Sequence, residues 1–139
     1  MENDIYIECD LKISTANRPR VSKGGYTYYA KTYQKFRKDF KAFLKSKYPN
    51  ILFKHKEDKG LFVVINVYTH ANKLKAIEYS TSRKDVDNIA KSILDGMNEV
   101  IYDDDSQVCI LCISKFNTPR DTSFTIFVKE FNKNVQICN

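Results

Sequence analysis

The stretch Leu61-Phe-Val-Val-Ile-Asn-Val-Tyr68 decides the fold, because it is a nearly continuous apolar run with several Val and Ile residues. Such a run is typical of a strand at the centre of a sheet. Alternating or β-branched residues on either side predict further strands over residues 5–13, 107–116 and 123–131. The turn-rich connector Asn117-Thr-Pro-Arg-Asp121 suits a hairpin between the last two strands.

Two helices are expected between these strands. Apolar residues spaced three and four apart predict a helix over residues 28–48, and the same pattern predicts a second one from Val86 to about Asn98. Residues 14–27 and 69–83 are expected to form loops. The resulting order, β-α-β-α-β-β, predicts an α+β fold. We expect a single domain over residues 1–139, with a mixed four-stranded sheet and two helices packed on it.

The charges are distributed unevenly along the chain. Residues 11–60 carry fourteen bases and three acids, whereas residues 85–105 carry one base and seven acids. A basic surface attracts a polyanion, and a local group of acids repels it unless cations neutralise them. The pattern indicates a nucleic-acid-binding protein whose acids either bind metal ions or face away from the nucleic acid.

The chain shows no sign of export or membrane insertion. No apolar stretch approaches the roughly 20 residues of a membrane span, and the N-terminus lacks the features of a secretory signal. Cys109 and Cys112 are three residues apart on a predicted strand, so they point to opposite faces and do not readily hold one zinc ion. We expect a cytoplasmic protein with reduced thiols.

Two groups of acids flank the second predicted helix. Asp85 and Asp87 stand where an extended segment turns into the helix, and Asp103-Asp104-Asp105 precedes the strand that begins at Gln107. The first group could have only a structural role as helix caps, and the second could be acids of a solvent-exposed turn. Two carboxylates held side by side nevertheless repel each other unless a cation or a proton separates them.

Lys91 lies four residues after Asp87 and four before Asp95, so the three side chains share one helix face. An ordinary i, i+4 ion pair is the simplest explanation. Together with the acids, however, these residues fit the hydrolysis of a phosphodiester. Carboxylates are ligands that Mg²⁺ prefers, bound metal activates water and neutralises phosphate charge, and a lysine steadies that charge or orients the water.

The ordered run from Arg83 to Val108 resembles the signature of the RusA family of Holliday-junction endonucleases, which is D-x-D-N-x-x-K-x-x-x-D-x-x-N followed by D-D-x-Q-V. The loop Asn17-Arg-Pro-Arg20 and the segment Tyr33-Gln-Lys-Phe-Arg37 are also similar to the N-terminal half of the family. The resemblance implies a homodimeric, Mg²⁺-dependent enzyme, with Mn²⁺ as a substitute metal. Such an enzyme nicks opposing strands of a four-way DNA junction in recombination and repair.

The resemblance also implies roles for individual residues. Asp85 and Asp87 take the positions of the paired metal-binding aspartates. Lys91 takes that of the catalytic lysine, and Asp105 that of the third essential aspartate. The implied catalytic set is therefore these four residues. The implied metal ligands are the three aspartates together with Asp104, the acidic neighbour of Asp105.

Asp103 falls where the family varies, so we treat it as peripheral. Asp95 and Asn98 also match the signature, but an ion pair and a helix end explain them structurally. A helix over residues 88–98 is ~15 Å long, so its two ends separate the acid groups. Three arrangements remain open: the chain returns to the first group, the helix is shorter, or Asp105 meets the first group of a partner subunit.

The basic half of the chain supplies the expected DNA contacts, with arginines in the first loop and lysines along the first helix. They are Arg18, Arg20, Lys23, Lys31, Lys35 and Lys38. Arginine pairs bidentately with phosphate, whereas a solvated helix face is the competing explanation for the lysines. Two other functions stay open. One is a non-catalytic DNA-binding module whose acids are caps and turns, and the other is a metal nuclease that acts on flaps or single strands.

Overall fold

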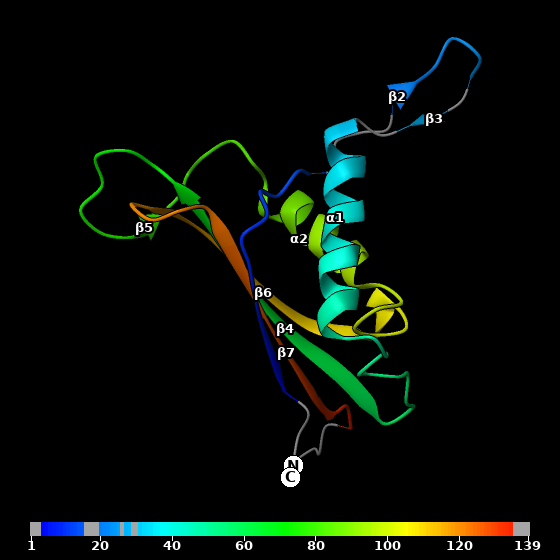
Figure 1. Cartoon of the computed structure of the whole chain (residues 1–139). Coiled ribbons are helices and arrows are strands. Elements are labelled where there is room, and N and C mark those ends of the chain that lie inside the picture. The colour runs from blue at the N-terminus through cyan, green and yellow to red at the C-terminus, as the bar shows by residue number, and fades with distance from the viewer. Residues whose placement is uncertain (1–3, 16–19, 26, 29–30, 135–139) are drawn as a thin grey trace.

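The computed structural model describes residues 4–15, 20–25, 27–28 and 31–134, with the backbone alone at residues 20, 27 and 28. A five-stranded sheet in the order β1-β7-β4-β6-β5 forms its centre. These strands are β1 (Ile5–Cys9), β4 (Lys59–His70), β5 (Glu78–Tyr79), β6 (Val108–Thr118) and β7 (Ser123–Asn132). A separate ribbon of β2 (Arg20–Val21) and β3 (Thr27–Tyr28) lies beyond the N-terminal end of α1 (Lys31–Lys47), as Figure 1 shows.

The apolar run that was predicted to be central lies in β4, the middle strand of the sheet. Ile65 pairs with Ile113 of β6 in the parallel sense and with Ile126 of β7 in the antiparallel sense. The sheet is therefore mixed, as predicted. The expected hairpin between β6 and β7 is wrong, because β4 lies between them. Their connector crosses the end of β4, where the Ala71 N–H donates to the Thr118 carbonyl oxygen at 2.9 Å.

The prediction of four strands is also wrong, because the sheet has a fifth strand, β5. This strand has only two residues, too few to show an alternating pattern, and it lies in a segment that was expected to be a loop. Tyr79 of β5 pairs with Phe116 of β6, and their rings stack with centroids 4.8 Å apart. A contact between side chains that are distant in sequence thus turns a loop into an edge strand. The ribbon β2–β3 lies mostly in a predicted loop, but it also includes Tyr28, with which the first helix was predicted to begin.

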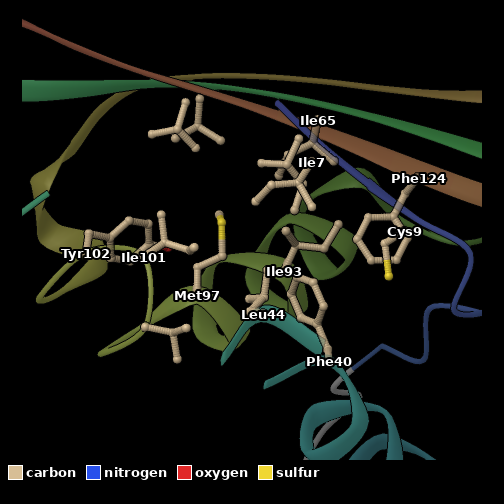
Figure 2. Close-up of a cluster of buried hydrophobic side chains, with 14 of the residues drawn as sticks. Ile7, Cys9, Phe40, Leu44, Ile65, Ile93, Met97, Ile101, Tyr102 and Phe124 are labelled. Carbon is tan, nitrogen blue, oxygen red and sulfur yellow. The ribbon is translucent and has the colours of Figure 1, made fainter. Parts of the chain in front are cut away.

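Helices α1 and α2 (Val86–Met97) lie on the same side of the sheet (Figure 1). Figure 2 shows the apolar layer between these helices and the sheet, in which helix side chains such as Phe40 and Ile93 face Ile65 of the sheet. Phe40 is fully buried, and its ring centroid lies 5.4 Å from that of Phe124 in β7. Burial of this layer holds α2 in a defined position on the sheet. In the described part of the chain, neither helix is long and apolar enough to cross a membrane.

Gly96 of α2 lies directly against Phe40 of α1. A Cβ atom at this position would overlap the ring of Phe40. The absence of a side chain therefore lets α2 lie against α1, and it does so one residue after Asp95. This packing contact positions the C-terminal end of α2, which carries Asp95.

Candidate active site

Asp85 and Asp87 lie at the exposed beginning of α2. Asp85 occupies the N-cap position with an extended backbone (φ −75°, ψ 136°), but its carboxylate accepts no capping hydrogen bond. Asp87 follows in the first turn. Capping therefore does not account for the Asp85 carboxylate, and both acids face solvent at the positively polarised end of the helix.

The segment before α2 is held by Lys115 of β6, a residue that the sequence did not single out. Its Nζ donates to the carbonyl oxygens of Ser82 at 2.5 Å and Lys84 at 2.6 Å. These bonds connect the sheet to the residues that immediately precede Asp85. Lys115 thus fixes the direction in which the chain enters α2.

Lys91 lies on the exposed side of α2. Within the described ranges it forms no ion pair with Asp87 or Asp95, so the expected i, i+4 pairing is not found. The ammonium group remains free to contact a phosphate or a water molecule between the two ends of the helix.

The second acid group begins a short 3₁₀ turn, η1 (Asp105–Gln107), that is built by its neighbours. Asp104 caps this turn, since its carboxylate accepts the Ser106 N–H at 3.1 Å while its own N–H donates to Gln107 Oε1 at 2.9 Å. The hydrogen bond from Ser106 lowers the pKa of Asp104. Gln107 Nε2 in turn donates to the Phe53 carbonyl oxygen at 3.0 Å, which anchors the turn to the core. The D-D-x-Q element therefore holds Asp105 in place.

Asp105 lies beside Asp95, with the two carboxyl groups within hydrogen-bonding reach. Burial raises the pKa of Asp95, and the Asp105 charge raises it further, whereas the charges of Lys91 and Arg37 lower it. Two carboxylates this close repel each other, and either a proton or a cation relieves the repulsion. Asp95 was not expected to belong to the site. The signal that could have found it is its match to the aspartate four residues after the motif lysine.

The chain does not bring its two acid groups together. Asp87 and Asp95 are eight residues apart on α2, which separates them by ~12 Å along the axis. Among the described residues, no three His, Cys, Asp or Glu side chains are placed to hold one metal ion. Two of the three predicted arrangements are therefore wrong. The helix is not shorter than expected, because α2 has twelve residues, and the chain after α2 does not bring Asp105 back to Asp85. A site shared with a partner subunit stays a prediction.

Lys41 of α1 holds the C-terminal end of α2. Its Nζ donates to the carbonyl oxygens of Asp95 and Gly96, each at 3.3 Å, and to that of Asn98 at 2.9 Å. Burial lowers the pKa of Lys41. This role could not be predicted from the sequence, because only the packing of α1 against α2 shows that Lys41 caps a helix. Asp103, which was expected to be peripheral, accepts the His55 N–H at 2.6 Å.

The structure describes part of the predicted DNA-contacting set. Lys23, Lys31 and Lys38 are exposed, whereas Lys35 pairs with Asp39 at 2.7 Å on the surface. Arg18 lies outside the described residues, and for Arg20 the backbone in β2 is described without the side chain. The role of these residues in binding DNA stays a prediction.

A basic α+β fold with carboxylates at both ends of α2, and with a lysine between them that forms no ion pair among the described residues, has the features of a nuclease. The family model described as Endodeoxyribonuclease RusA matches residues 10–129, which is most of the chain. The chain therefore belongs to the RusA family, whose members are structure-specific endodeoxyribonucleases of Holliday junctions, and the predicted resemblance is confirmed. The chain is also 48% identical over 42 residues to an uncharacterised protein, YqaN, of Bacillus subtilis (strain 168), a match that spans 30% of each chain.

Proposed function

We propose that this protein is a Mg²⁺-dependent endodeoxyribonuclease that resolves four-way DNA junctions by paired, symmetric hydrolysis of phosphodiester bonds in recombination and repair. The observation that carries the proposal is the arrangement along α2. Asp85 and Asp87 lie at the N-terminal end of α2, and the Asp85 carboxylate accepts no capping hydrogen bond. Asp95 and Asp105 lie at its C-terminal end. Lys91 lies between them without an ion pair among the described side chains.

The acid groups fit a divalent cation by their chemistry. Asp85 and Asp87 are both exposed, and the Asp85 carboxylate accepts no capping hydrogen bond. Asp95 and Asp105 repel each other in a partly buried position, which a cation would relieve. When bound, Mg²⁺, or Mn²⁺ in its place, would activate water and neutralise charge on the phosphate. Asp104 would contribute from the second group, although its carboxylate already caps η1.

The remaining groups bind and orient the DNA. Lys91 would place its ammonium beside the scissile phosphate, where it steadies the charge that develops on the oxygens or orients the attacking water. The exposed lysines of α1 would attract the backbone of the junction, which makes binding weaken steeply as salt rises.

We further propose that the protein acts as a homodimer in which Asp85 and Asp87 of one protomer meet Asp105 of the partner subunit. The ~12 Å between the acid groups of one chain supports this arrangement, as does the need for two cuts that are related by symmetry. Each of the two sites would then combine acids from both chains.

A labelled four-way junction titrated with Mg²⁺ tests the reaction. We expect Asp85→Asn and Asp105→Asn to reduce cleavage at least about a thousandfold while junction binding stays intact or tightens, because a negative charge near phosphate is removed. Asp103→Asn is the matched control, since asparagine keeps the acceptor for the His55 N–H. Loss of binding in parallel with cleavage would show that the acids hold the fold instead. Equal cutting of linear duplex and junction would favour a nuclease of different specificity.

Mixed dimers test where the site is completed. A dimer of one Asp85→Asn chain and one Asp105→Asn chain retains one intact site if each site draws on both chains. If each site lies within one chain, both sites are inactive. We therefore expect co-expressed, differently tagged variants to regain nicking of one strand, whereas each variant alone stays inactive. An inactive mixed dimer would exclude the shared site.

A further inference from the structure

A small hollow of about 50 Å³ lies between the sheet and the first turn of α2. Its lining combines three lysines and several hydroxyl side chains with four apolar side chains, those of Leu11, Ile13, Val67 and Ile89. The lysines are Lys12, Lys84 and Lys115, and the hydroxyl residues include Ser80, Ser82 and Thr122. Among the described residues, no aspartate or glutamate lines it. A partly open hollow that is lined by lysines and hydroxyl groups favours an anion.

The volume of the hollow limits the size of the group that it can bind. At ~10–15 Å³ per water, it holds about three to five water molecules. A phosphate group, with four oxygens around one atom, has about that size, whereas a planar nucleobase is too large. The hollow thus fits a phosphate rather than a base.

Hydrogen-bond donors remain for such a group. Two N–H donors of Lys115 are used by the carbonyl oxygens of Ser82 and Lys84, which leaves the third. The Ser80 Oγ accepts the Ser82 N–H at 3.2 Å, so its own hydroxyl hydrogen remains to be donated. Lys12 is an exposed lysine whose charge adds to these donors at the hollow.

We propose that this hollow binds a phosphate of the DNA backbone next to the phosphodiester on which Asp85 and Asp87 act. The proposal rests on the proposed nuclease function. Ser82 lines the hollow only three residues before Asp85, so the two positions lie within roughly 10 Å of each other. A phosphate held there would fix the register of the DNA strand relative to the acid groups.

The first test uses inorganic phosphate and metal-free protein in EDTA, followed by amide NMR shifts. We expect saturable shifts at residues 12, 80–84 and 122. Lys12→Gln should weaken phosphate binding about tenfold, as expected for one charge-assisted contact. Lys75→Gln removes an exposed lysine outside the hollow and should leave the affinity unchanged. The proposal is overturned if these amides do not shift, if the shifts do not saturate, or if both variants weaken binding equally.

The second test measures steady-state cleavage of a four-way junction. Lys12→Gln should raise KM about tenfold with little change in kcat, because the contact is made equally in the ground and transition states. Ser82→Glu should raise KM more than Ser82→Gln, which has the same size without the charge. The slope of log affinity against log salt should fall by roughly one unit in Lys12→Gln.

The two tests separate the possible failures. If the wild-type protein cuts no junction with Mg²⁺, the proposed nuclease function fails, and the phosphate titration still decides whether the hollow binds an anion. If phosphate binds but Lys12→Gln leaves KM and the salt slope unchanged, the hollow takes a free anion, and its role as a DNA contact is overturned.

Discussion

Substitution of Gly96 by alanine probes the packing that positions the end of α2. The added Cβ would overlap the ring of Phe40, which is fully buried. That ring also stacks on Phe36 at 5.5 Å and lies edge-on to Phe124 at 5.4 Å, so it has little room to move away. We therefore expect Gly96→Ala to force the two helices apart or to displace the ring from its rotamer.

The expected magnitude follows from two opposing effects. Overpacking of a well-filled core costs about 1–3 kcal/mol, whereas alanine is favoured over glycine inside a helix by up to about 1 kcal/mol. Gly96→Ala should therefore lower the free energy of unfolding by about 1–2 kcal/mol. In a Phe40→Leu background the smaller side chain relieves the overlap, and the same substitution should become neutral or stabilising.

Urea unfolding of the wild type, the two single variants and the double variant measures this coupling. We expect an interaction free energy above about 1 kcal/mol, since the two residues are in direct contact. The reasoning is refuted if Gly96→Ala stabilises the wild type, or if it costs the same free energy in both backgrounds. Either result would mean that α2 is not held against Phe40.

Three further predictions concern other parts of the chain. Lys41→Met should lower the free energy of unfolding by about 1–2 kcal/mol, because three carbonyl oxygens at the end of α2 lose their shared donor; chemical unfolding measures this, and Lys41→Arg should cost less. Burial raises the pKa of the Cys9 thiol above its value in the unfolded chain. The neutral thiol therefore contributes fully to the free energy of unfolding below the pKa of the unfolded state, and this contribution is lost as pH rises through the pKa of the folded state. Unfolding between pH 8 and 11 should accordingly show a shallower decline in Cys9→Ala, and equal declines would contradict the buried thiol. Asp39→Asn removes the partner of Lys35 on the surface of α1, so stability should change by less than about 0.5 kcal/mol, while junction binding tightens in a filter-binding assay.

Much of the fold could be predicted from local patterns. The continuous apolar run in β4 indicated a central strand, which has one buried and one half-buried face, and the spacing of apolar residues indicated both helices. The partners of each strand could not be predicted in the same way. A turn-rich connector shows that the chain reverses, but the insertion of β4 between β6 and β7 depends on packing between distant segments.

The candidate site also combines features that the sequence predicts with features that depend on tertiary packing. The order of Asp85, Asp87, Lys91 and Asp105 is a property of the sequence, and it was enough to identify the RusA family. Their separation in space depends on the turn after α2, which brings Asp105 to Asp95 instead. The sequence could not show this, because a motif records spacing along the chain and not the path of the loop between its parts.

By itself, the sequence determined the central strand, the two helices and the acidic motif of this protein, because each depends on residues close together in the chain. Only the tertiary structure decided that Lys41 caps α2, that Lys115 holds the entry to α2 and that a lysine-lined hollow lies beside Asp85. Each of these features joins side chains from different elements. Their geometry depends on how the helices and the sheet pack, which local periodicity does not encode.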